Sequence, residues 1–272
     1  MARLLDLFAR KSNAAADEQP MQAAVDAAKM GDYQTALALW EPLARTGDAR
    51  AQNNIGACFA GGLGVERDAG LAKRWLTLSA EAGYPAAQRN LASLYFTGEG
   101  LETDPVEAAR LYRAAAEQGD PPAQDMLSWM LVEGEAIPAD PVEAERWALA
   151  AAENGIAASM TRLGMLYHNA LGVPRDAEEA VRWWRRGAEA GDADGQAMLG
   201  AALHMGSGVP RDPFMAYIWL LRGKGGGSDL AAPFMTAARE ALDTTQRAQA
   251  EAEAGHDLTS PADVTTLGAE RP

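Results

Sequence analysis

The side chains that most often catalyse reactions or bind metals are scarce in this chain of 272 residues, which has one cysteine and three histidines. Two of the histidines, His168 and His204, lie 36 residues apart. A zinc ion shared between them would need a ring nitrogen from each at about 2 Å. Helices that stack side by side lie about 8–10 Å apart, so we expect a ridge of two solvated histidines rather than a metal site.

Sequence motifs of common active sites are absent. No segment matches G-x-x-x-x-G-K-[ST], H-E-x-x-H, G-x-S-x-G or C-x-x-C. The run Gly61–Gly64 has the glycines of a phosphate-binding loop, but no strand precedes it and similar turns recur along the chain. Glu178 and Glu179 suit the start of a helix, where carboxylates offset the helix dipole. The sequence therefore predicts no catalytic residues, no metal and no cofactor.

The composition of the chain limits where the protein is expected to be located and which classes of molecule it is expected to bind. The formal net charge of −14 argues against nucleic-acid binding, which needs a surface of Lys and Arg, and favours basic partners. Cys58 is expected to be buried and inert, and one cysteine cannot form an internal disulfide. No apolar run approaches the ~20 residues of a membrane span, and the start, MARLLDLFARKSN, is too polar for a signal peptide. We therefore expect a cytoplasmic protein without stable membrane insertion.

Residues 49–228 repeat with a period of 36 residues and without a gap. The five repeats cover 49–84, 85–120, 121–156, 157–192 and 193–228. A large residue recurs in register in the second half of each repeat: Trp75, Leu111, Trp147, Trp183 and Trp219. A strict period of this length indicates stacked supersecondary units rather than one globular core.

The second repeat shows why each one is expected to be a pair of helices. Ala87 and Leu91 lie at helical spacing in its first half, and Gly98 suits the left-handed residue that ends a helix. Asp104 is placed to cap a second helix, with Glu107 completing a capping box. Because this pattern of helix, turn, helix recurs, the chain is predicted to be all-α.

Atypical segments flank the repeats. Residues 21–48 predict a helix pair with a shorter turn that caps the N-terminal end, and residues 229–254 predict capping helices at the other end. Together with the repeats they form one predicted α-solenoid over residues 21–254. Residues 1–20 are expected to be a tail and linker, and the polar residues 255–272 a disordered tail.

Two further expectations concern the C-terminal end. The glycines of residues 222–227 predict a frayed last turn, since glycine destabilises a helix by about 1 kcal/mol relative to alanine. Residues 230–242 predict one helix that closes the stack. Asp243 and Gln246 have the spacing of a capping box that starts another helix.

The recurring pattern resembles the Sel-one-like repeat, a branch of the tetratricopeptide superfamily. It includes A-Q-x-x-L-(G/A)-x-x-Y-x-x-G-x-G and later A-x-x-(W/L)-(Y/W)-x-x-A-A-x-x-G, and it is cleanest over Ala87–Gly119 and Gly164–Gly191. The resemblance implies a right-handed superhelical solenoid of stacked antiparallel helix pairs that mediates protein–protein interaction. Cysteine-rich relatives have been linked to β-lactam binding, but one cysteine does not fit that subgroup.

In superhelices of this superfamily the first helix of each repeat lines a concave groove. The resemblance therefore implies that a protein or peptide partner binds non-core residues of those helices: Asn54, Arg89, Asn90, Asp125, Trp129, Arg162, Met165 and His168. An Asn amide can pair with both polar groups of a peptide backbone, and the two arginines could bind carboxylates. Trp129 replaces mostly smaller residues of the other repeats, so it either anchors a partner or fills local space.

Three functions are carried forward as hypotheses. The first is a non-enzymatic scaffold whose groove binds a peptide or protein. The second is a hydrolase of cell-wall or β-lactam-like substrates, for which the sequence offers no recognisable pair of nucleophile and base. The third is a membrane-surface regulator tethered weakly by residues 1–11, a candidate short amphipathic helix in which Leu4, Leu5, Leu7 and Phe8 are apolar and Arg3, Arg10 and Lys11 flank them. A frayed tail is the alternative explanation for that segment.

Two tryptophan truncations test the predicted core. Trp183→Ala is expected to lower the free energy of unfolding by about 3–5 kcal/mol, because it truncates a core side chain. Trp129→Ala is expected to lower it much less, since position 129 is outside the recurring core pattern. Chemical denaturation of both variants measures the difference, and equal losses would show that the two faces are assigned wrongly.

Overall fold

The structure is a computed structural model that describes residues 18–255. Residues 18–29 are helical, so the first helix includes residues before the predicted start at 21. The helices that follow are α2 (Tyr33–Arg45), α3 (Ala49–Gly61), α4 (Ala69–Glu81), α5 (Pro85–Thr97), α6 (Pro105–Glu117), α7 (Pro121–Glu133), α8 (Pro141–Glu153), α9 (Ala157–Asn169), α10 (Ala177–Glu189), α11 (Ala193–Met205), α12 (Pro213–Gly225), the 3₁₀ turn η1 (Asp229–Ala231), α13 (Ala232–Glu240) and α14 (Thr244–Ala254). The hypotheses about residues 1–11 and the predicted disordered tail after Gly255 lie outside the described residues.

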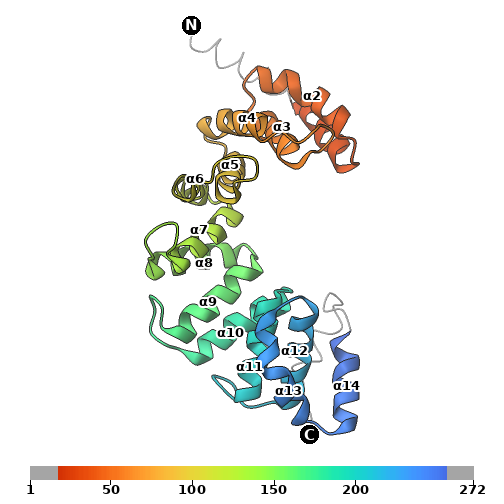
Figure 1. The fold of residues 1–272 in the computed structure, drawn as a ribbon, viewed down its shortest axis with the longest axis vertical. Helices are drawn as coiled ribbons and strands as arrows, with labels where there is room; N and C mark the ends of the chain where they lie inside the picture. The colour runs from red at the N-terminus through yellow and green to blue at the C-terminus, as the bar shows by residue number, and fades with distance from the viewer. Residues whose placement is uncertain (1–17, 256–272) are drawn as a thin grey trace, which may run out of the picture. The chain divides into compact units, whose positions relative to one another are not determined.

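The chain divides into two compact units between Ala123 and Gln124. In the first unit α3 packs against α4 and α5 against α6, and the two first helices, α3 and α5, are neighbours (Figure 1). In the second unit α9 pairs with α10 and α11 with α12, again with α9 beside α11. Helices α13 and α14 pack on α12. Within residues 18–255 no strand occurs, and the predicted all-α solenoid of stacked helix pairs is confirmed.

Aspartate side chains start the second helices, as predicted. The Asp104 carboxylate accepts the backbone N–H of Glu107 at 2.9 Å. The predicted capping box is nevertheless wrong, because the N–H of Asp104 donates instead to the carbonyl of Tyr95 at 2.9 Å. Because the N–H of Asp104 is already used, the Glu107 carboxylate has no backbone donor at the start of α6. It accepts hydrogen bonds from Arg110 instead. The box predicted at Asp243 does form, at the start of α14.

In three of the repeats a glycine of the first helix lies against a large residue of the second helix. A Cβ atom on Gly200 would lie 2.8 Å from Leu220 Cγ, and one on Gly164 would collide with the Trp184 ring. The recurring large residues lie on the same second helices, and Leu111, Trp147, Trp183 and Trp219 are buried, while Trp75 is partly buried. The predicted core positions are therefore confirmed, and α-helices that approach this closely leave no room for a methyl group.

The last repeat does not end in a frayed turn, contrary to the prediction. Helix α12 continues to Gly225, and Gly223 is buried against the start of α11. A Cβ on Gly223 would lie 2.8 Å from the backbone nitrogen of Ala197. The glycines therefore permit close packing of two helices, which offsets their low helix propensity. The next segment also differs, because it begins with the turn η1 and Leu230 is exposed rather than packed in a helix.

One alanine occupies a position where the other first helices end in glycine. Ala170 has φ of +57°, and it is the only non-glycine residue with positive φ among residues 18–255. The equivalent Gly206 has φ of +73°. A Cβ in the left-handed region destabilises the backbone by about 1–2 kcal/mol.

Reciprocal substitutions at these two positions test that strain. Ala170→Gly is expected to raise the free energy of unfolding by about 0.5–1 kcal/mol, because the relieved strain exceeds the added flexibility of the unfolded chain. Gly206→Ala is the matched control and is expected to lower it by a similar amount. Urea denaturation measures both, and a loss of stability in Ala170→Gly would contradict this account.

Candidate binding surface

Three amide side chains form a short chain across α3 and α5. Asn90 Nδ2 donates to Asn53 Oδ1 at 2.9 Å, and Asn53 Nδ2 donates to Asn54 Oδ1 at 3.2 Å. Asn53 is buried, whereas Asn54 and Asn90 are partly exposed. These bonds leave the Asn54 Nδ2 donor and the Asn90 Oδ1 acceptor without a partner among the described residues. Two of the predicted site residues are thus held in place with polar groups still open.

Arg89 does not offer a free charge, contrary to the expectation that it would bind a partner's carboxylate. Its Nε lies 3.0 Å from an oxygen of Asp120, whose side chain is only 11% exposed. Asp120 also accepts the N–H of Ala123 at the start of α7. The guanidinium is therefore neutralised by a residue that caps the next first helix.

Arg162 and Asp125 are brought together as an ion pair, which was also not expected. Arg162 Nη1 lies 2.6 Å from Asp125 Oδ1, and the two side chains are 12% and 18% exposed. The hydroxyl of Ser159 donates to the same carboxylate at 2.6 Å. Both predicted site residues therefore join α7 to α9, and neither is available as an isolated charge.

The fifth residue of each of these first helices bonds either to the next first helix or to the aspartate that caps it. Asn53, Arg89 and Asp125 do so as described above, and the hydroxyl of Thr161 donates to Asp192 at 2.6 Å. The chemistry differs at each step, from amide pair to ion pair to hydroxyl. In these four helices the side chain at the fifth position therefore contributes to the stacking of helices, whatever its type.

Trp129 and Met165 occupy the same register position on α7 and α9. Trp129 is partly buried, and Met165 is 38% exposed. Trp129 is thus neither a fully exposed anchor nor a core residue like the recurring tryptophans. Met165 has the larger exposed fraction of the two side chains.

The two histidines in register form neither a solvated ridge nor a metal site. His168 packs on Trp184 with ring centroids 5.3 Å apart, and His204 packs on Phe234 at 6.5 Å. Nδ1 of each histidine is buried without a hydrogen-bond partner. Among residues 18–255, no group of three or more His, Cys, Asp or Glu side chains is placed to hold a metal ion. Predicted site residue His168 therefore belongs to an aromatic contact.

Sequence analysis did not identify a set of buried glutamines that bond the first helix of one repeat to the helix before it. Gln52 Nε2 donates to the carbonyl of Ala44 at 3.0 Å, and Gln196 Nε2 donates to that of Ala188 at 3.2 Å. Each amide thus adds a hydrogen bond to a carbonyl near the end of the preceding second helix, which also accepts the backbone N–H of the glycine that follows that helix. The signal was present as a glutamine that recurs every 36 residues in four of the five repeats, at Gln52, Gln88, Gln124 and Gln196.

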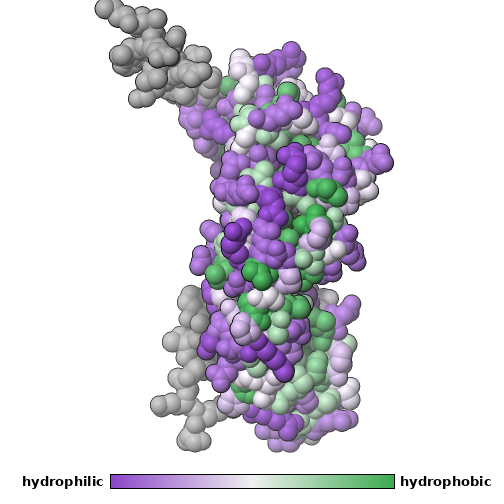
Figure 2. Space-filling model, turned by 90° about the vertical axis from the view of Figure 1, so that its left-hand side faces the viewer, coloured by the Kyte–Doolittle hydropathy of each residue, from purple (hydrophilic) through white to green (hydrophobic). Residues whose placement is uncertain are grey.

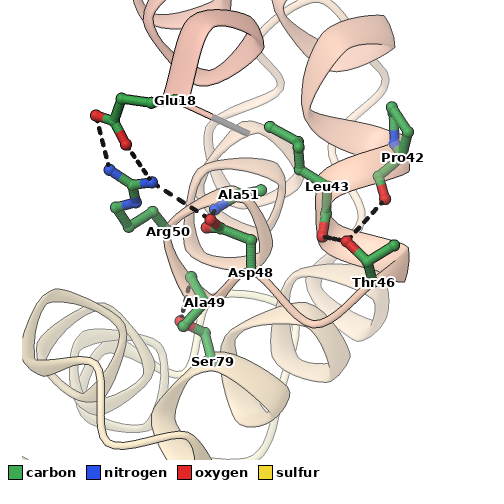
Figure 3. Close-up of polar contacts among 9 residues, drawn as sticks. All are labelled: Glu18, Pro42, Leu43, Thr46, Asp48, Ala49, Arg50, Ala51 and Ser79. Atoms are coloured by element: carbon green, nitrogen blue, oxygen red, sulfur yellow. Dashed lines mark hydrogen bonds and ion pairs between the residues drawn. The ribbon is translucent and has the colours of Figure 1, made fainter. Parts of the chain in front are cut away.

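The start of α3 collects polar contacts from neighbouring helices (Figure 3). Arg50 pairs with Glu18 at 3.1 Å and with Asp48 at 3.4 Å. The hydroxyl of Ser79, on α4, donates to the carbonyl of Ala49 at 2.6 Å. These contacts join the helix over residues 18–29, α3 and α4. Arg50, like Arg89 and Arg162, therefore takes part in contacts between the helices of the solenoid.

Figure 2 shows hydrophilic side chains over most of the face it displays, with hydrophobic ones in smaller groups between them. Val106 and Val142, on the second helices α6 and α8, are 64% and 63% exposed. Cys58 is buried, and burial raises the pKa of its thiol, as expected for an inert cysteine. No helix in residues 18–255 has the length and apolar character to cross a membrane.

A double-mutant cycle tests whether Asp125 and Arg162 hold adjacent repeats together. The coupling energy between Asp125→Asn and Arg162→Met is expected to be about 1.5–3 kcal/mol, because the charged hydrogen bond is largely shielded from water. The exposed pair Glu107 and Arg110 is the control and is expected to give about 0.2–0.5 kcal/mol. Chemical denaturation of each set provides the energies. Equal coupling in the two pairs would mean that the bond between repeats adds nothing to a surface ion pair.

The chain is similar to known repeat proteins. The family model described as Sel1 repeat matches residues 49–84, 85–120, 121–156, 157–192 and 193–225. A solved Sel1 repeat protein from Oxalobacter formigenes is 28% identical, with 89% of this chain and 99% of that chain covered and a TM-score of 0.77. No curated protein matches.

More distant solved structures share less. A protective antigen of uropathogenic Escherichia coli with an SLR fold is 22% identical over 94% of this chain and 72% of that chain, with a TM-score of 0.47. A putative sel1 repeat protein from Klebsiella pneumoniae is 20% identical over 74% and 98%, also with a TM-score of 0.47. The resemblance seen in the sequence is confirmed by the five matched repeats: this chain belongs to the Sel1 repeat family.

Proposed function

We propose that this chain is a non-enzymatic scaffold that binds a protein or peptide partner through the exposed faces of its first helices. Sel1 repeat proteins are typically protein-interaction scaffolds. Each repeat of a solenoid contacts only its neighbours, which leaves an extended surface for partners. The expectation of a cytoplasmic protein is part of the same proposal.

The observation that carries this proposal is that some polar and apolar groups on the first helices take no part in the contacts between repeats. In the first compact unit, the Asn54 donor and the Asn90 acceptor stay open while Asn53 holds both residues in place. In the second, Met165 keeps an exposed apolar side chain. Amides that are held in place, as in the first unit, and exposed methionine side chains, as in the second, are groups that interfaces use for contact and specificity.

The two alternative functions stay as hypotheses of lower rank. A hydrolase requires a nucleophile in contact with a base, and no observation on the described residues favours such a pair. A membrane-surface regulator would depend on residues 1–11, which lie outside the described residues. The scaffold is preferred because its candidate groups, Asn54, Asn90 and Met165, lie among the described residues.

Paired baits test the proposal. Wild type, Asn54→Ser/Met165→Ser and the control Val106→Ser/Val142→Ser are immobilised, and proteins retained from a lysate of the source cell are identified by mass spectrometry. A protein held by wild type and by the control but lost by Asn54→Ser/Met165→Ser is the expected result. All four substitutions are at partly or fully exposed positions, so circular dichroism should show unchanged helix content. Retention of the same proteins by all three baits would remove the first-helix faces as the binding surface.

A further inference from the structure

The second compact unit has an apolar strip on its first helices. Four residues form this strip, which we call the methionine strip: Met126, Trp129, Met165 and Met198. Met126 and Trp129 are on α7, Met165 on α9 and Met198 on α11. Met165 is 38% exposed, and the other three are partly exposed.

Contacts between the helices place these residues side by side. The Asp125–Arg162 bond joins α7 to α9 at 2.6 Å. Trp129 and Met165 lie one helical turn farther along the two helices, in the same direction, so they are neighbours. Helix α11 packs beside α9, and Met198 has the register of Arg162. The strip therefore runs across three adjacent first helices.

The charges around the strip are acidic. Arg162 is the only Lys or Arg on α7, α9 and α11, and its guanidinium is paired with Asp125. Glu133 and Asp194, on the same three helices, are exposed carboxylates. An occupant that carries positive charge would be attracted to this setting, and an acidic one repelled.

The spacing of the helices favours a helical occupant. Neighbouring packed helices lie about 8–10 Å apart, and seven residues of an α-helix rise about 10.5 Å. A helix laid across the strip would thus bring one apolar row over each first helix. Side chains on one face of a β-strand recur about every 6.6 Å, which does not match. Methionine side chains adapt to the shape of such a ligand, and tryptophan is frequent at hot spots.

We propose that the methionine strip binds a cationic amphipathic helix of a partner protein. The inference rests on the proposed scaffold function and names the class of ligand for its second compact unit. Apolar residues of the ligand would contact the strip once per heptad, and its Lys or Arg residues would face Glu133 and Asp194.

A model peptide tests the inference on the full chain. The probe is fluorescein-labelled LKKLLKLLKKLLKL, whose leucines form one face of a helix, and binding is followed by fluorescence anisotropy at physiological salt. Met165→Ser is expected to weaken binding by about fivefold or more, as loss of an interface anchor does. Val142→Ser, which removes a more exposed side chain of α8 in the same compact unit, is expected to change it by less than about twofold.

Two control peptides separate the contributions of the apolar face and of charge. A scrambled peptide of the same composition without an apolar face, and the version with Glu in place of Lys, are both expected to bind at least about tenfold more weakly. Equal effects of Met165→Ser and Val142→Ser would overturn the inference, as would tight binding of either control peptide. If the probe is insensitive to Met165→Ser but a cellular partner is still lost by Asn54→Ser/Met165→Ser, the helix inference fails while the scaffold function stands.

Discussion

The close approach of the two helices in a repeat is the constraint on which the rest of the structure depends. Gly56 faces Leu76, Gly164 faces Trp184 and Gly200 faces Leu220, in each case without room for a Cβ atom. Tight packing of this kind sets the distance between helices, and interiors do not tolerate an added methyl group without strain. The backbone N–H of the aspartate that caps each second helix bonds to a carbonyl of the first helix of the same repeat, across this short distance between the two helices.

Polar side chains join one repeat to the next. Buried glutamines bond to carbonyls at the end of the preceding second helix, and the fifth residue of α3, α5, α7 and α9 bonds to the next first helix or to the aspartate that caps it. The residue types at the fifth position vary between Asn, Arg, Asp and Thr, but the contact is kept. Residues with charges that suggest ligand binding, such as Arg89 and Arg162, are therefore used inside the stack, where an unpaired buried charge would be destabilising.

In the proposed scaffold, recognition of a partner would depend on first-helix residues that take no part in contacts between repeats. In a solenoid the shared positions make the contacts between repeats, so specificity comes from the residues that differ from one repeat to another. Trp129, Met165 and the open amides of Asn54 and Asn90 are of this kind. If both units bind partners as proposed, the apolar strip with acidic neighbours in the second unit and the held amides in the first would give them different binding chemistry.

The period, the helix pairs, the capping aspartates and the core tryptophans were predictable from the sequence, because they depend on local propensity and on a pattern that recurs five times. The partners of polar groups were not. Asp125 meets Arg162 across two helices, the N–H of Asp104 bonds to Tyr95 rather than to Glu107, and Gly223 packs against Ala197 instead of fraying. These outcomes were decided by the tertiary structure, because they depend on the distance between packed helices, which periodicity along one helix does not contain.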